Sequence, residues 1–139
     1  MRPSRLPALP LRPHVARRLA LGLAAMRAGL GVTALAAPTL ASRPWIGEDA
    51  ARAGTRLFGR AMGGRDLALG AGALLAARSG LPVRGWVAAG ALADLSDTVA
   101  TATSYRHLPR RSRPLVLAVT LGATVAAVLL LPLVDGPRR

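Results

Sequence analysis

The sequence predicts an all-α protein, a four-helix transmembrane bundle with short loops, and three observations lead to this prediction. Apolar residues make up 52% of the 139 residues, yet only 3% are aromatic, whereas soluble cores take much of their buried area from Phe, Tyr and Trp. The 15 Gly residues and abundant Ala suit helices that approach closely in lipid. Apolar segments recur at about the 20-residue length that crosses a bilayer. The predicted spans are residues 19–37, 57–77, 85–105 and 115–134.

The chain divides into a basic, Pro-rich leader at 1–18, a membrane domain at 19–134 and a basic tail at 135–139. The first span is expected to end before Pro38, because a proline disfavours helix at the residue before it. The same region also resembles a signal peptide with a cleavage site at residues 34–36, and the Arg17-Arg18 pair is suggestive of a twin-arginine signal.

We favour a retained first span over cleavage for two reasons. Arg27 interrupts the apolar run, and further apolar segments follow it, which export of a soluble product would leave stranded. The next stretch, residues 41–47, is expected to be a loop. Glu48 and Asp49 resemble the acidic first turn of a helix. That helix is expected to run unbroken from Asp49 to about Arg78, with amphipathic first turns at the membrane interface.

The third span, residues 85–105, is the least apolar, because it contains two Asp and several hydroxyl side chains. Trp86 and Tyr105 lie near its two ends, about 28 Å apart along a helix. That separation is typical of the two aromatic belts of a membrane protein. With Trp45 in the preceding loop, these residues are the predicted interface anchors.

The fourth span, residues 115–134, contains no charged residue. Pro114 stands at its start, where a missing N–H costs little, and Pro132 lies near its end. Arg residues flank the span on both sides. We favour several crossings of a bacterial inner membrane with both termini in the cytoplasm, because the opposite orientation would export the five Arg residues of the leader. The favoured orientation places the basic loop at 106–113 outside, against the positive-inside rule.

Ionisable residues near the middle of the first three spans are the candidate functional site. Unpaired, they would cost on the order of 15 kcal/mol on insertion scales, which exceeds the stability of most domains. Antiparallel helices bring the mid-points to one level, so we expect Arg–Asp pairs facing one another, since Arg bridges carboxylates with parallel hydrogen bonds. The predicted polar centre, a candidate ligand or proton site, comprises Arg27, Arg60, Arg65, Asp66, Asp94, Asp97 and Thr101.

Glycines at helical spacing are the predicted helix-packing positions. Gly59, Gly63 and Gly70 share a stripe of the second span with Asp66, and the stripe opens with a G-x-x-x-G spacing that lets a neighbouring backbone come close. Gly90 lies on the stripe of the third span that holds Asp94.

Composition and motifs also disfavour several classes of function. The net charge is +13, but the Arg residues are dispersed along the chain and flank apolar segments, which suits anionic lipid headgroups better than nucleic acid. The chain has no Cys, and His14 and His107 stand apart in flanking regions, so no metal site is expected. No nucleotide-binding or nucleophile-elbow motif is present. We therefore expect no cofactor and no enzymatic activity.

Two hypotheses remain for the function. In the first, this is a structural or partner-binding membrane protein, and the buried charges fix the packing of its helices. In the second, it is a minimal transporter of a small solute, or a proton-coupled carrier, in which Asp66, Asp94 and Asp97 titrate. Because four helices are few for a carrier, the second hypothesis also predicts a homo-oligomer.

Three motifs resemble those of small four-helix integral membrane proteins of unknown function from GC-rich bacteria. They are the run GRAMGGRDLALGAGALL at 59–75, the run ALADLSDTVAT at 91–101, and an Arg-bearing first helix ending at Ala37-Pro38. The resemblance covers roughly residues 19–130. It implies four spans and an inner-membrane location, and it implies no activity, cofactor or catalytic residue.

Overall fold

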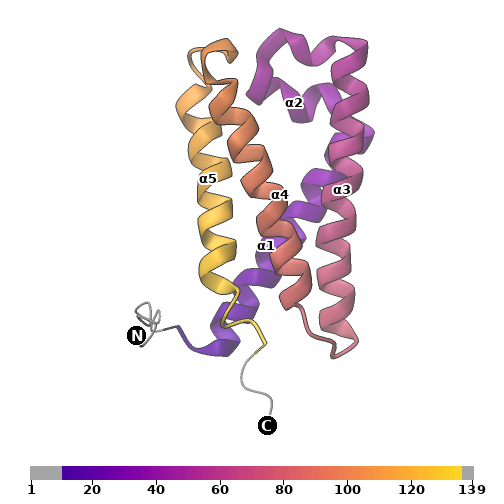
Figure 1. Cartoon of the computed structure of the whole chain (residues 1–139). Helices are drawn as coiled ribbons and strands as arrows, with labels where there is room; N and C mark the ends of the chain where they lie inside the picture. The colour runs from indigo at the N-terminus through magenta and orange to yellow at the C-terminus, as the bar shows by residue number, and fades with distance from the viewer. Residues whose placement is uncertain (1–10, 136–139) are drawn as a thin grey trace, which may run out of the picture.

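The computed structural model describes residues 11–135, which form five α-helices and two short 3-10 helices and contain no strand. The prediction of an all-α chain is thus confirmed. Four long helices run side by side, and the short helix α2 lies across one end (Figure 1). The elements are α1 Pro13–Ala36, α2 Pro38–Ile46, η1 Gly47–Ala51, α3 Ala53–Arg78, α4 Arg84–Thr103, η2 Tyr105–His107 and α5 Arg113–Leu130.

The predicted boundaries differ from the observed ones at both ends of the chain. Helix α1 begins at Pro13, six residues before the predicted span, because Pro is well suited to a first helical position. Helix α5 begins at Arg113 with Pro114 in its first turn, as expected, but it ends at Leu130 and continues as turns. Pro132 lacks the N–H that would continue the helix, so the predicted end at residue 134 was wrong. Parts of the predicted leader (1–10) and tail (136–139) lie outside the described residues.

The segment between the first two long helices is helical, and the prediction of a loop at 41–47 was wrong. Ala37 leaves the helical conformation, and Pro38 then starts α2 in a new direction. Gly47 ends α2 with a φ of 64°, which favours glycine. The predicted unbroken helix from Asp49 was also wrong. Glu48 and Asp49 lie in η1, and the extended backbone of Arg52 separates η1 from α3.

The four long helices associate as two pairs. Helix α1 packs most extensively on α3, and α4 packs on α5, whereas the two pairs touch each other far less. Glycine permits the first contact, because a Cβ added at Gly31 would lie 2.7 Å from the carbonyl oxygen of Gly63. A Thr98–Thr124 hydroxyl contact of 3.2 Å joins α4 to α5. The two pairs therefore leave room between them.

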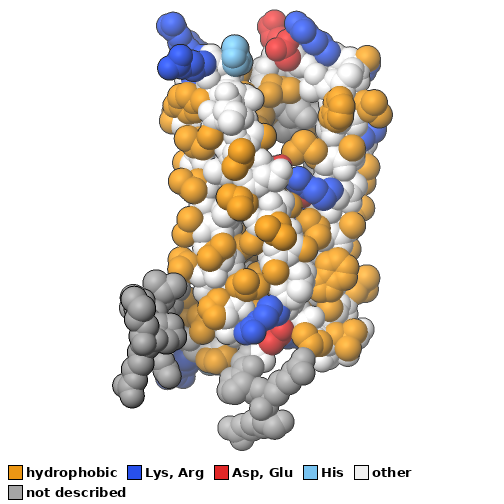
Figure 2. All heavy atoms as spheres, viewed as in Figure 1, with side chains coloured by type: hydrophobic (Ala, Val, Ile, Leu, Met, Phe, Trp, Pro, Cys, Tyr) orange, Lys and Arg blue, Asp and Glu red, His pale blue; other side chains and the backbone are white. Residues whose placement is uncertain are grey.

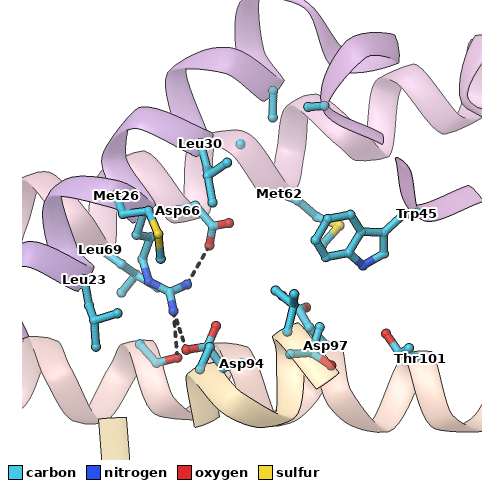
Figure 3. Close-up of a pocket in the computed structure, with 18 of the residues that line it drawn as sticks. Leu23, Met26, Leu30, Trp45, Met62, Asp66, Leu69, Asp94, Asp97 and Thr101 are labelled. Atoms are coloured by element: carbon cyan, nitrogen blue, oxygen red, sulfur yellow. Dashed lines mark hydrogen bonds and ion pairs between the residues drawn. The ribbon is translucent and has the colours of Figure 1, made fainter. Parts of the chain in front are cut away.

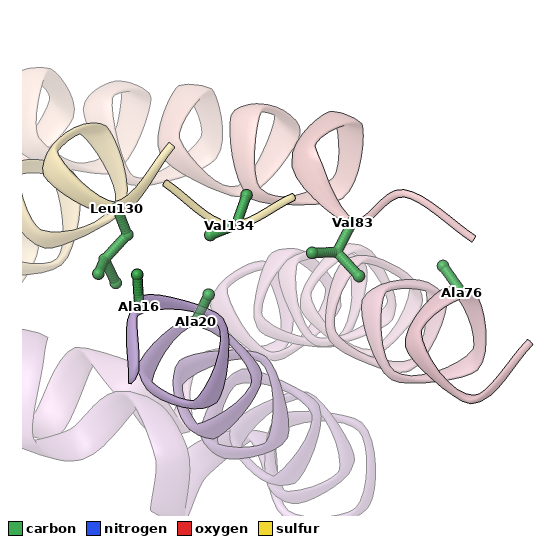
Figure 4. Packing of buried hydrophobic residues seen from close by; sticks show 6 residues of the cluster. All are labelled: Ala16, Ala20, Ala76, Val83, Leu130 and Val134. Carbon is green, nitrogen blue, oxygen red and sulfur yellow. The ribbon is translucent and has the colours of Figure 1, made fainter. Parts of the chain in front are cut away.

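A cluster of buried apolar residues lies at the end of the molecule where the described chain begins and ends. Ala16 and Ala20 of α1 meet Val83 and the residues that follow α5 there (Figure 4). Asp135 ties this end together: it accepts hydrogen bonds from the backbone N–H groups of Val83 and Arg84, both at 3.0 Å, and pairs with Arg17 at 3.3 Å. The start of α1, the start of α4 and the segment after α5 are thereby joined.

Large apolar side chains face outward, whereas the interior is built mainly of Ala and Gly. Phe58 is 71% exposed and Leu92 is 69% exposed, and large apolar side chains are also exposed elsewhere on all four long helices. Figure 2 shows hydrophobic side chains over most of the visible face, with charged side chains near its two ends and one basic side chain at mid-height. Within the described residues, α1 and α5 are long and apolar enough to cross a membrane, a criterion that core helices and signal sequences also meet; α3 and α4 fall below it.

Candidate functional site: a charged centre on a cavity between the helix pairs

Five of the seven predicted polar-centre residues converge near the mid-points of three helices. Arg27 comes from α1, Arg65 and Asp66 come from α3, and Asp94 and Asp97 come from α4. Each lies about halfway along its helix, so the antiparallel arrangement brings them to a common level. We call these five residues the charged centre.

Arg27 makes the first of two ion-pair links between the helix pairs. Its guanidinium donates to Asp66 Oδ1 at 3.0 Å and to Asp94 Oδ2 at 2.5 Å, and more weakly to the carbonyl oxygen of Gly90 at 3.5 Å (Figure 3). The Arg27 side chain is only 16% exposed. The guanidinium lies against Gly90, where an added Cβ would be in ordinary van der Waals contact with Arg27 Nε at 3.6 Å. A side chain larger than Ala at this position would compete with the guanidinium for space.

Arg65 makes the second bridge. Its two terminal nitrogens donate to the two oxygens of Asp97 at 3.1 and 2.7 Å, in the parallel geometry that makes Arg–carboxylate pairs strong. Its Nε also donates to Asp66 Oδ1 at 3.2 Å. Asp66 Oδ1 therefore receives hydrogen bonds from both arginines, and the five side chains form one connected network.

The other two predicted members of the centre lie outside this network. Arg60 is exposed and donates to the backbone carbonyl oxygen of Leu35 at 3.3 Å, away from every Asp of the centre. Its place in the predicted centre was wrong, because its helical position points it toward α2 and the end of α1. Thr101 is buried on the same face of α4 as Asp97, but it makes no hydrogen bond to the charged residues.

The loss of Arg60 changes the charge of the centre. The sequence suggested three Arg balanced by three Asp, whereas the structure assembles two Arg with three Asp. The centre therefore carries a formal charge of −1 when all five groups are ionised. A net charge in a low-dielectric setting is costly unless something neutralises it.

The charged centre is not sealed by packing, because it lines a cavity of about 480 Å³ between the two helix pairs. Arg27, Asp66, Asp94 and Asp97 all contribute to its wall. The remaining wall is largely apolar and includes Leu23, Met26, Leu30, Met62 and Leu69, some of whose side chains surround the ion pairs in Figure 3. A pocket of this size, mainly apolar with a few convergent polar groups, is typical of small-molecule sites.

Three of the four predicted glycine positions, Gly59, Gly63 and Gly70, lie at close helix contacts, whereas Gly90 faces only the side chain of Arg27. A Cβ at Gly63 would lie 2.9 Å from Ala34 Cβ, and one at Gly70 would lie 2.6 Å from the backbone nitrogen of Ala28. Gly59 faces Pro38 at 3.3 Å, in α2 rather than α1. Sequence reasoning missed Gly31, although its stripe on α1, spaced i, i+4, i+7 with Arg27 and Ala34, carried the same signal as the stripe on α3.

The three predicted anchor aromatics are divided between the two ends of the molecule. Trp86 lies near the start of α4, with its ring against Gly72 of α3. Tyr105 lies in η2 at the opposite end, where the Arg113 guanidinium stands 5.9 Å from its ring centroid. Trp45 and Trp86 also line the cavity, a placement that sequence reasoning did not foresee.

The described residues offer no group of three or more His, Asp or Glu side chains that could hold a metal ion. The three Asp of the centre are instead directed at guanidinium groups. Comparisons with family models, with curated proteins and with solved structures found no match to this chain.

Proposed function

We propose that this chain is a four-span integral membrane protein that binds a small, largely apolar solute in the cavity beside its charged centre. The observation that carries the proposal is the cavity itself. Ion pairs that served only to fix packing would be expected to fill the space around them, yet four of the five charged residues border about 480 Å³ of open volume. The proposal develops the carrier hypothesis, for which such a site is the minimum requirement.

The distribution of side chains supports a bilayer setting. Soluble monomers rarely expose contiguous apolar patches beyond about 300–600 Å², whereas here large apolar side chains are exposed along all four long helices. These helices measure about 27–39 Å at 1.5 Å per residue, close to the roughly 30 Å of hydrocarbon in a bilayer. Paired charges lower the cost of inserting α3 and α4, which are less apolar than α1 and α5.

The proposed topology places both termini and the turn at Ser79 in the cytoplasm, and α2, η1 and η2 on the other side. The chain has no Cys, so single-cysteine variants report exposure cleanly. In spheroplasts, a membrane-impermeant maleimide is expected to label Glu48→Cys and Arg110→Cys directly, but Ser79→Cys only after permeabilisation. Direct labelling of all three would exclude four spans, and release of the chain by carbonate washing would exclude insertion altogether.

The binding proposal is tested with the two Trp residues, because both line the cavity. Bromine quenches Trp emission on contact, so para-bromobenzyl alcohol, para-bromobenzyltrimethylammonium and para-bromophenylacetate are added to the protein in lipid nanodiscs. We expect saturable quenching by at least one of these probes. Ala100→Phe, which places a ring in the cavity wall, is expected to weaken binding about tenfold, which corresponds to 1.4 kcal/mol.

Ala102→Phe is the matched control. Ala100 and Ala102 are both exposed residues of α4, but only Ala100 lines the cavity. The control is expected to bind the probes like the unchanged chain. Quenching that rises linearly with every probe, or that is insensitive to Ala100→Phe, would reduce the charged centre to a packing device and favour the structural hypothesis.

A further inference from the structure

We propose that the ligand of the cavity is a monovalent organic cation with an apolar body, held by the carboxylates of Asp66 and Asp94. This inference depends on the proposed function, because it names the class of ligand for the same cavity. It follows from the charge of the centre, from the free carboxylate oxygens and from the character of the surrounding wall.

The first step is the charge of the centre. Two guanidinium groups, Arg27 and Arg65, face three carboxylates, and each Arg already bridges two of them. No further cationic side chain of the described chain forms an ion pair with the centre. Helix α5 brings no compensating charge, because its residues from Pro114 to Leu130 are all uncharged. One positive charge is therefore needed from outside the chain.

The second step is the location of the free acceptor atoms. Asp66 Oδ2 and Asp94 Oδ1 accept no hydrogen bond from any residue that the structure describes, whereas both oxygens of Asp97 are engaged by Arg65. The described chain has no fully buried side-chain oxygen or nitrogen without a partner. These two oxygens therefore keep some exposed surface, and both residues line the cavity, although Asp94 is only 9% exposed.

The third step is the rest of the wall. Leu23, Met26, Leu30 and Leu69 lie around the ion pairs of Arg27, and Met62 lies beside the ring of Trp45 (Figure 3). Both Trp residues line the cavity. Apolar side chains favour burial of an apolar body, and Trp faces attract cations. A hydrated metal ion would find few oxygen ligands here, whereas an amphiphilic ammonium ion meets carboxylates at one point and hydrocarbon around it.

A proton can neutralise the same carboxylates and must compete with the organic cation. The charged groups that face Asp66 and Asp94 are Arg27 from α1, Arg65 from α3 and Asp97 from α4. Because a guanidinium has no acceptor for a further proton, the competing proton binds a carboxylate. Affinity for a permanent cation is therefore expected to fall as the pH is lowered, whereas affinity for a neutral probe stays constant.

The three bromobenzyl probes described above test this inference without any variant. We expect para-bromobenzyltrimethylammonium, whose charge does not titrate, to bind about tenfold or more tightly than the alcohol, and the phenylacetate to bind weakest. Lowering the pH is expected to reduce this preference. If the alcohol or the phenylacetate binds saturably and the cation binds no better, the inference is overturned while the proposed function stands. If no probe binds saturably, the proposed function itself fails.

Variants that remove one negative charge test whether the cation binds at the carboxylates of Asp66 and Asp94. Asp94→Asn and Asp66→Asn are each expected to remove the preference for the cation over the alcohol and its dependence on pH. Asp49→Asn is the matched control, because Asp49 pairs with Arg52 at the exposed end of the molecule, and it is expected to leave the preference intact. Retention of the full preference in a folded Asp94→Asn or Asp66→Asn protein would overturn the assignment to that residue, and retention in both would overturn the inference.

Discussion

Arg27→Leu is expected to lower the free energy of unfolding by about 3–5 kcal/mol, the range found when one partner of a buried ion pair is removed. The guanidinium of Arg27 bridges Asp66 on α3 and Asp94 on α4, so its loss leaves three carboxylates facing Arg65 alone. One of the two ion-pair links between the helix pairs at mid-length is lost at the same time, while the link from Arg65 to Asp97 remains. Unfolding of the purified protein in mixed micelles, titrated with SDS and followed by circular dichroism, measures the effect.

Arg60→Leu is the control for this prediction. Arg60 is exposed, and the structure gives its side chain a single hydrogen bond, to a backbone carbonyl oxygen, so its replacement is expected to change stability by no more than about 0.5 kcal/mol. Adding Asp94→Asn to Arg27→Leu is expected to recover part of the loss, because the double variant has one uncompensated carboxylate fewer. Equal effects of the two Arg substitutions would show that the charged centre contributes nothing to stability.

Gly31→Ala is expected to have the second-largest effect, a loss of about 1–3 kcal/mol from overpacking. Its added Cβ would lie 2.7 Å from the carbonyl oxygen of Gly63 and 2.8 Å from Leu67 Cα. Both are backbone atoms, which cannot rotate away, so α1 and α3 must separate. The same SDS titration measures the stability, and a helix-separating substitution is also expected to lower the yield of folded protein.

Gly29→Ala gives the opposite prediction from the same substitution two residues away. A Cβ at Gly29 would meet nothing within 4 Å, and Ala is favoured over Gly in a helix by about 1 kcal/mol. Gly29→Ala is therefore expected to be neutral or stabilising. If both variants behaved alike, the close approach of α1 and α3 at Gly31 would be contradicted.

Helix identity was largely predictable because it is set by local chemistry. Apolar runs, Pro38 and Pro114 at helix starts, and the turn after Ser79 are all visible in the sequence, and the long helices lie close to the predicted spans. The errors occurred where two local signals competed. Pro44 and Gly47 suggested a loop, but Pro38 is equally able to start a helix, and α2 formed.

The charged centre was predictable to the extent that depth along a helix determines it. Arg27, Asp66 and Asp94 lie at helix mid-points, so antiparallel packing aligns them whatever the rotation of each helix. Arg60 shows where this reasoning ends. It lies less than two turns from Arg65, but it is on a different face of α3 and donates to Leu35 instead of to an Asp of the centre. Position along the helix therefore does not tell an Arg that joins the centre from one that faces away from it.

The sequence by itself determined that the chain is helical, which segments are apolar, and that opposite charges lie at one level, since these follow from residue type and spacing. Only the tertiary structure decided that α1 pairs with α3 and α4 with α5, which leaves a cavity where a closed bundle would have none. It also decided that two Arg, and not three, face three Asp. The reason is that helix rotation and partner choice depend on close contacts such as Gly31 with Gly63, which form only between segments distant in the chain.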